Sequence, residues 1–344
     1  MGTDRVVGVD VARGLAVLGM LVAHVGPDDA ARLPNGSSWL EAFDGRSAAG
    51  FALLAGVSAA LLSRGPEDDR LTRARVRVLA RAAVLAPLGF VLAALGTPVV
   101  VILPAYAVMF AMLTVALRWR PRTLLATAAV VAAVGPPAVL ALRDVVDGEA
   151  GFLWSEYYPP LVWIAYLLVG LAVGRVLGCP TTPGRLAVWG LAAAAVGHTT
   201  NALAMRVVAP EQTVLRALLT TAPHSDSGVE VLANTGSVLV VLAGCLVVGA
   251  RRPRVLTPLA ATGALALTAY SGQVVAIALL GRRVVFEPTW PVLVGFALVT
   301  LVAATAWRLT LGRGPLERLL HTVSTAVADA VAPRPAPAAV TPAR

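Results

Sequence analysis

Three ionisable residues share one face of the first apolar segment, residues 5–27. They are Asp10, Arg13 and His24. On an α-helix, eleven residues at about 100° each return to within about 20° of the starting direction, so Arg13 and His24 lie on one face, about 16 Å apart along the axis. An ionisable group inside a bilayer costs roughly 2.5–3.5 kcal/mol, so we interpret this stripe as a functional site that faces protein or water.

The imidazole of His24 is the group on this stripe best suited to general-base chemistry, because it titrates near neutral pH. Two structural alternatives stay open from the sequence. Asp10 and Arg13 are three residues apart on the helix, so they can neutralise each other and serve only the fold. His24 lies near the end of the segment and is equally compatible with a polar residue at the membrane interface.

The composition predicts an all-α, polytopic integral membrane protein with about ten membrane-spanning helices. Hydrophobic residues make up 58% of the 344-residue chain and charged residues 14%, with a mean hydropathy of +0.78. Apolar stretches of about 20 residues, the length that crosses a bilayer as a helix, recur along the sequence. The predicted spans are residues 5–27, 46–64, 74–95, 98–118, 123–143, 159–178, 185–205, 229–250, 257–281 and 288–309.

The charges of the connecting loops predict how these spans are oriented. Arginines gather in the loops after the second, fourth and eighth spans, whereas the loops after the first and fifth spans are acidic. By the positive-inside rule, the arginine-rich loops and both termini are cytoplasmic, and His24 lies near the external side. Arg282 and Arg283 fall in an external loop and break this pattern. The net charge of +9 therefore indicates topology rather than a nucleic-acid partner.

We divide the chain into a transmembrane domain at residues 1–312, an amphipathic cytoplasmic helix at 313–330 and a disordered Pro- and Ala-rich tail at 331–344. Arginine without lysine, together with abundant Ala, Val, Gly and Pro, is typical of a GC-rich bacterial genome and predicts the bacterial inner membrane. The two cysteines, Cys179 and Cys245, do not indicate a disulfide or a metal site. No Gly-rich phosphate loop or zinc motif occurs, so no metal is expected.

Several blocks of the sequence resemble the transmembrane acyltransferase superfamily, which includes the acyltransferase-3 family and heparan-α-glucosaminide N-acetyltransferase. Residues 5–20 resemble its first helix, and Arg13, ten residues and then His24 are similar to the acyltransferase-3 signature. Residues 44–58 resemble the second helix of the bacterial heparan-acetyltransferase-like group. The remaining blocks are Tyr157–Trp163, Gly170–Arg175, Pro223–Ser225 and Leu259–Gln273, the last of which resembles the bacterial domain of unknown function 418.

The resemblance implies a membrane acyltransferase that moves an acyl group, acetyl in the family-level expectation, from cytoplasmic acyl-CoA to an external glycan or glycolipid. Acyl transfer needs a base for the acceptor and a positive group near the developing oxyanion. His24 is expected to deprotonate the acceptor or to carry the acyl group briefly. Arg13, beside Asp10, is expected to stabilise the negative charge.

Two further sets of residues are assigned to the substrates. Guanidinium groups match phosphate geometry, so arginines near the cytoplasmic end of the third span are candidates for holding coenzyme A, although they also fit a positive-inside anchor. These are Arg73, Arg75, Arg77 and the more deeply placed Arg81. The residues assigned to the acceptor on the external side are Asp44, Arg46 and His224. Asp44 and Arg46 can alternatively pair with each other.

The chain departs from the animal lysosomal enzyme in the loop after the first helix. There the catalytic histidine shortly precedes a tryptophan, whereas residues 35–39 of this chain read Asn-Gly-Ser-Ser-Trp. The catalytic role therefore stays with His24. Among the other polar residues, Ser227 and Glu230 fit a helix-capping box, and His198 fits an interhelical hydrogen bond. A polar patch at residues 270–273 fits helix packing equally well.

Two other functions remain open from the sequence alone. A transporter or flippase would use the Asp10, Arg13 and His24 stripe as a substrate or proton path. A non-catalytic member of the family is the third possibility. The oligomeric state is left open, and a homodimer is compatible with the sequence.

Overall fold

The computed structural model describes residues 6–27, 38–63, 68–143 and 157–332. The described chain is helical, which confirms the all-α prediction. Its helices are α1 (Val7–Val25), η1 (Trp39–Phe43), α2 (Arg46–Leu62), α3 (Asp68–Ala93), α4 (Leu103–Ala116), α5 (Pro121–Arg143), α6 (Pro160–Val176), α7 (Thr182–Val207), α8 (Thr213–Leu219), α9 (Gly228–Arg251), α10 (Thr257–Ala264), α11 (Ala266–Leu280), α12 (Arg283–Phe286), α13 (Trp290–Thr310) and α14 (Pro315–Val331). The residues expected to form a disordered tail, except 331–332, lie outside the described residues, as does most of the loop without a histidine.

The helices support a multi-pass membrane protein but do not confirm ten spans. Within the described ranges, six helices are long and apolar enough to cross a membrane, or seven if the bent pair α10 and α11 forms one span. The predicted spans at 98–118 and 159–178 become the shorter helices α4 and α6, because the chain before each contains prolines and is not helical. The long helix α7 carries consecutive polar residues at 198–201, which lower its hydropathy.

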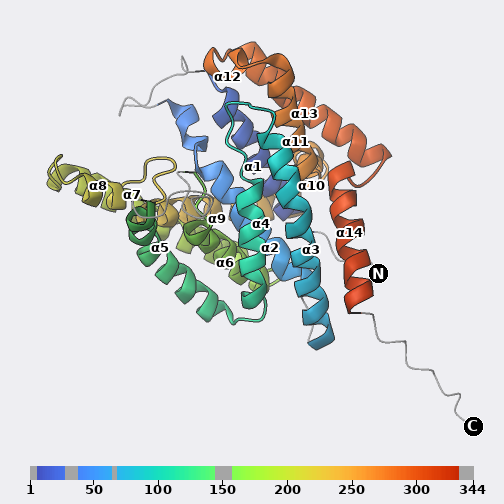
Figure 1. Ribbon diagram of the computed structural model, residues 1–344, viewed down its shortest axis with the longest axis horizontal. Coiled ribbons are helices and arrows are strands. Elements are labelled where there is room, and N and C mark those ends of the chain that lie inside the picture. Colours follow the sequence, from blue (N-terminus) through green and yellow to red (C-terminus); the bar gives the residue numbers. More distant parts are fainter. Residues whose placement is uncertain (1–5, 28–37, 64–67, 144–156, 333–344) are drawn as a thin grey trace, which may run out of the picture.

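Helix α1 lies in the middle of the bundle and packs against α2, α9 and α10 (Figure 1). More than half of it is buried inside the protein, although it is apolar enough to span a membrane. Small residues make this close packing possible. A Cβ atom on Gly14 would meet the backbone carbonyl of Leu259 on α10, so a larger residue at this position would push the two helices apart.

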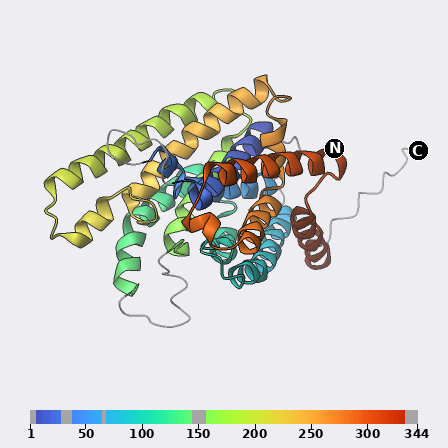
Figure 2. The same ribbon diagram turned by 90° about the horizontal axis from the view of Figure 1, so that it is seen from above.

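Two further close pairs complete the core. Helix α2 packs along α6, where a Cβ on Gly170 would meet the backbone of Leu53. Helices α7 and α9 run side by side along one flank of the bundle, with α8 joining their far ends (Figure 2). The loops at the ends of these pairs bring distant parts of the sequence together.

The chain breaks sharply between α10 and α11, where the two axes bend by 82°. A broken helix leaves carbonyl and N–H groups without partners inside the bundle. Arg13 donates one hydrogen bond to the Gly263 carbonyl at 3.2 Å, near the end of α10. Glu317 on α14 accepts hydrogen bonds from the backbone N–H groups of Leu267 and Thr268, at 2.8 and 3.0 Å, and from the Thr268 hydroxyl at 2.6 Å. A cation therefore meets the carbonyl end of one half-helix, and a carboxylate meets the N–H end of the other.

We expect Glu317→Ala to destabilise the protein by about 2–4 kcal/mol, because it leaves two backbone donors and one hydroxyl without their acceptor. Thermal unfolding of the detergent-solubilised protein measures this change. The matched control is Glu287→Ala, which removes an exposed pair with Arg283 at 3.2 Å and should cost less than about 1 kcal/mol. Equal effects of the two substitutions would contradict the role of Glu317 at the break.

Candidate active site

A cavity of about 260 Å³ opens where several helix ends and loops meet at one end of the bundle. Its walls come from the last turn of α1, the start of α2, the loop before α4, the segment before α6, the loop before α9, and α12. Three predicted site residues, His24, Asp44 and His224, line it together. They are far apart in the sequence, so the fold alone brings them into one site.

The two imidazoles carry unused hydrogen-bonding atoms. The Nδ1 atoms of both His24 and His224 are buried and have no hydrogen-bond partner. The two rings are also close enough for their charges to interact. A buried polar atom without a partner costs free energy, so such atoms in a cavity indicate groups that bind a ligand or a reacting proton.

His224 is held by the loop that contains it. Its backbone has a φ of 58°, in the left-handed region that few non-glycine residues adopt. Its N–H donates to Glu230 Oε1 at 3.1 Å, while Glu230 Oε2 accepts from the Ser225 hydroxyl at 2.9 Å and the Asp226 N–H at 2.8 Å. Burial lowers the pKa of His224, which favours the neutral imidazole.

This arrangement corrects the capping-box interpretation in part. Ser227 does cap α9, because its hydroxyl accepts from the Glu230 N–H at 2.9 Å. The Glu230 carboxylate, however, does not return to the Ser227 backbone. It is buried and organises the whole loop from His224 to Asp226, so it positions a wall of the cavity.

Aromatic side chains fix the orientation of the His224 ring. The ring stacks on Trp163, with centroids 6.5 Å apart and planes 15° apart. Tyr158 and Tyr157 approach it edge-on, at 5.2 and 5.6 Å. Tyr157 and Tyr158 also line the cavity. From the sequence, this segment had only a family resemblance and no assigned role. Its proximity to Pro223–Ser225 depends on tertiary packing.

Asp226 connects the loop to α6 and α5. Its carboxylate accepts a hydrogen bond from Trp163 Nε1 at 2.7 Å and lies 3.5 Å from the guanidinium of Arg143. Burial raises the pKa of Asp226 from 3.8 to about 7, and the negative charge of Glu230 adds to this, against the opposing effects of Trp163 and Arg143. The carboxyl group is therefore close to half protonated at neutral pH.

Gly45 allows α2 to approach the His224 loop. Its φ of 65° lies in the left-handed region, and a Cβ atom there would lie 3.1 Å from Glu230 Oε1 and 3.6 Å from the Cα of Pro223. A side chain at this position would strain the backbone and press on the carboxylate that holds the loop. This close approach places Asp44 at the cavity beside His224.

The structure does not bring the rest of the α1 stripe into this cavity. Arg13 forms an ion pair with Asp10 at 3.1 Å and donates to Ser58 Oγ at 2.8 Å, in addition to its bond with Gly263. Arg46 donates to the Ala42 carbonyl at 3.1 Å instead of pairing with Asp44, and it does not line the cavity. The contacts of Arg13 make it a link between α1, α2 and α10.

The four predicted donor-site arginines on α3 divide into two groups. Arg73 donates to the carbonyls of Ala328 and Ala332 and to Asp329, so it holds the end of α14 against α3. Arg75 donates to the Thr114 carbonyl at 3.2 Å. These two arginines serve the packing of α3.

Arg77 and Arg81 belong to a positively charged cluster at the end of the bundle that lies near α14. The Arg81 guanidinium interacts with the charges of Arg77, Arg313 and Arg13, and its buried Nε atom has no hydrogen-bond partner. Burial lowers the pKa of His321 on α14, and the neighbouring guanidinium groups lower it further. We call Arg77, Arg81, Arg313 and His321 the α14 cluster. The sequence predicted its two α3 members and missed the two that the fold adds.

Two further hydroxyl groups are buried without a hydrogen-bond partner. The hydroxyl of Tyr106 on α4 is buried without a hydrogen-bond partner, and Tyr106 interacts electrostatically with both Arg13 and Tyr158. The hydroxyl of Ser271 on α11 is also buried without a partner. Gln273 donates to the Val17 carbonyl at 3.3 Å, which agrees with a packing role for that part of the predicted polar patch.

Two protein families match parts of this chain. Residues 5–206 match the model of the heparan-alpha-glucosaminide N-acetyltransferase catalytic family. The chain belongs to this family. Residues 175–326 match a second family, described as a protein of unknown function (DUF418). No curated protein matches the chain.

The two matches confirm the resemblance to the heparan-alpha-glucosaminide N-acetyltransferase family and to the domain of unknown function 418, and they favour an acetyltransferase over a transporter. The family match covers His24, Asp44 and the aromatic segment at 157–163, whereas His224 and Glu230 lie in the region matched by the second family. The cavity is therefore built from both matched regions. No group of three or more metal-ligating side chains occurs among the residues that the structure describes.

The raised pKa of Asp226 gives this family member a pH-dependent stability. A carboxyl whose pKa is higher in the folded state adds stability that is fully present below pH 3.8 and is lost as the pH rises through about 7. We expect the Tm of the wild type minus that of Asp226→Asn to fall as the pH rises from about 4 to about 7 and to level off above that. The asparagine keeps an acceptor for Trp163, and the titration of His224 is common to both proteins. A difference that is constant over this range would show that Asp226 does not titrate there.

Proposed function

We propose that this chain is a membrane acetyltransferase that transfers an acetyl group from acetyl-CoA to a hydroxyl or amine of a glycan or glycolipid. The cavity that holds the unpartnered Nδ1 atoms of His24 and His224 carries this proposal, together with the family match. A cavity with convergent polar groups is the expected form of such a site.

In this mechanism His24 acts as the general base. It accepts the proton of the acceptor as the acceptor oxygen or nitrogen attacks the carbonyl carbon of the thioester. The carbon–sulfur bond then breaks, a carbon–oxygen or carbon–nitrogen bond forms, and the thiolate of coenzyme A takes the proton back from the imidazolium. His224 and Asp44, which line the same cavity, orient the acceptor by hydrogen bonding.

The α14 cluster is the proposed site for the phosphates of acetyl-CoA. Three guanidinium groups concentrate positive charge there, and the neighbouring imidazole of His321 adds a hydrogen-bonding group. Guanidinium pairs with phosphate in two-point hydrogen bonds. The long arm of coenzyme A would lead from this cluster past Tyr106 toward Tyr158 and His24. In the topology expected from loop charges, the donor binds at the cytoplasmic end and the acceptor at the external end.

Arg13 takes a different part in this proposal from the one expected on the sequence. Its guanidinium holds α1 against α2 and α10, and it does not line the cavity in which an oxyanion would form. We therefore assign it to positioning of α1, which carries His24.

We expect His24→Gln to lower the rate of acetyl transfer by about 10²- to 10⁴-fold, the usual contribution of a general base. Labelled acetyl-CoA supplied to the purified protein in proteoliposomes, with a glycan acceptor, measures the transfer. Glutamine retains size and polarity, so Tm and monodispersity should be unchanged. The matched control is His198→Gln on α7, an exposed histidine outside the cavity, which should keep full activity. Normal turnover by His24→Gln would refute the assignment.

We expect Arg81→Gln to raise the KM for acetyl-CoA roughly ten- to hundredfold, because a hydrogen bond to a charged group contributes about 1.5–3 kcal/mol. The kcat should change little. Arg75→Gln, an exposed arginine on the same helix, is the control and should leave the KM unchanged. If both variants bind acetyl-CoA like the wild type, the arginines of α3 act only as a topological anchor.

A further inference from the structure

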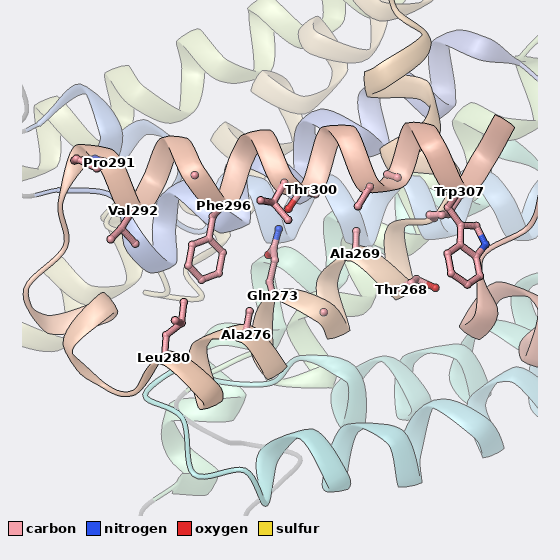
Figure 3. Close-up of a pocket in the computed structure, with 16 residues that line it drawn as sticks. Thr268, Ala269, Gln273, Ala276, Leu280, Pro291, Val292, Phe296, Thr300 and Trp307 are labelled. Carbon is pink, nitrogen blue, oxygen red and sulfur yellow. The ribbon is translucent and has the colours of Figure 1, made fainter. Parts of the chain in front are cut away.

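A second cavity, larger than the one at His24, lies between α11 and α13 (Figure 3). It has a volume of about 520 Å³ and is almost entirely apolar. Pro291 and Leu280 lie at one end of it, and Trp307 and Thr268 at the other, with Gln273 near the middle. We call it the α11–α13 groove.

The shape of the groove fits a single hydrocarbon chain. From Pro291 to Trp307 the α13 axis rises about 24 Å, so the volume of about 520 Å³ corresponds to an average cross-section of roughly 22 Å². That cross-section suits one extended chain and is too narrow for a fused ring system. A hydrocarbon core about 30 Å thick gives each leaflet about 15 Å, so the groove is longer than one leaflet.

The groove lies beside a helix that is exposed to the bilayer. Helix α13 is a candidate membrane span, and only 11% of its apolar window is buried inside the protein. A ligand can therefore enter sideways from the lipid. The indole of Trp307 donates to the Arg313 carbonyl at 3.1 Å and bounds one end of the groove.

The other end of the groove carries two exposed arginines. Arg282 and Arg283 lie in the short connection between Leu280 and Pro291, the residues that end the groove. They are the pair whose position broke the expected pattern of loop charges. Arg282 lies over the ring of Phe286 at 5.4 Å, and Arg283 pairs with Glu287. Two arginines in the connection that ends an apolar groove complement an anionic headgroup on a long chain.

The same connection reaches the candidate active site. Val285 of α12 lines the cavity with His24 and His224. A lipid seated in the groove would therefore hold its headgroup beside α12, next to that cavity.

We propose that the α11–α13 groove binds the chain of a polyprenyl phosphate lipid, whose phosphate meets Arg282 and Arg283 and whose attached sugar is the acetyl acceptor in the His24 cavity. The assignment of the sugar as acceptor rests on the proposed function; the binding of the lipid does not. The length of the groove favours a polyprenyl chain over the acyl chain of a phospholipid, which occupies one leaflet.

Two glycines allow the groove to be filled without disturbing the protein. A Cβ atom at Gly272 or Gly295 meets no heavy atom within 4 Å, and both residues line the groove. Gly272→Leu with Gly295→Leu therefore places two side chains in the space of the ligand. Gly244→Leu on α9 is the matched control, because a Cβ there also meets nothing within 4 Å and Gly244 lies outside the groove.

The test is photolabelling of the full chain in nanodiscs with a long-chain polyprenyl phosphate that carries a diazirine. We expect labelled peptides from α11 and α13, at least tenfold less labelling in the double leucine variant, and wild-type labelling in Gly244→Leu. Arg282→Gln with Arg283→Gln should weaken labelling severalfold, whereas Arg313→Gln at the other end should not. A diazirine phosphatidylglycerol that labels the groove equally well, or labelling that survives the double leucine variant, would overturn the proposal.

A second measurement separates the groove from the acetyltransferase chemistry. With a polyprenyl-linked sugar as acceptor, the double leucine variant should raise the KM for the acceptor at least tenfold and leave the KM for acetyl-CoA unchanged. Labelling without acetyl transfer in the wild type would support the lipid site and refute the proposed function. Acetyl transfer to a free sugar with the same KM as to the lipid-linked sugar would refute the groove as an acceptor site.

Discussion

The fold depends on the hydrogen bonds that the backbone groups receive at the break between α10 and α11. An interrupted helix within a membrane protein exposes backbone groups that lipid cannot bond, so each needs a partner from the protein. Arg13 supplies it for the Gly263 carbonyl, and Glu317 supplies it for the N–H groups of Leu267 and Thr268. Because Arg13 lies on α1 and Glu317 on α14, the break connects the first and last described helices of the chain.

This connection also explains why the site can be assembled from loops. Helix α1 is fixed at its Arg13 level, so its last turn presents His24 at a constant position relative to α2. On the other side of the cavity, the buried carboxylate of Glu230 holds His224 in a backbone conformation that is unfavourable for most residues. The helices and the fully hydrogen-bonded Glu230 carboxylate thus support the cavity. The Nδ1 atoms of His24 and His224 remain free to bind a ligand.

Much of this architecture could be predicted from the sequence, and the failures have physical causes. Periodic apolar segments predicted the helices. The 82° break at Leu265 could not be predicted, because no proline or charged residue occurs at that position. The grouping of Asp44 and His224 near His24 followed from their common position at helix ends facing one side. The pairing of Arg13 with Asp10 was one alternative open from the sequence, but the contacts of Arg13 with Ser58 and Gly263 could not be predicted, because these partners are distant in sequence. The role of Asp226 was missed for the same reason, since Trp163 and Arg143 reach it only in the folded chain.

The contacts of Arg13 have a consequence for biosynthesis. Asp10 precedes Arg13 by one helical turn and can neutralise it as soon as the first helix forms. Gly263 follows Arg13 by 250 residues, which a ribosome takes on the order of tens of seconds to add. During that interval α1 must enter the translocation machinery with a guanidinium whose final carbonyl partner has not yet been made. Asp10 therefore neutralises Arg13 during this interval. The carbonyl of Gly263 becomes available only when the last third of the chain is synthesised.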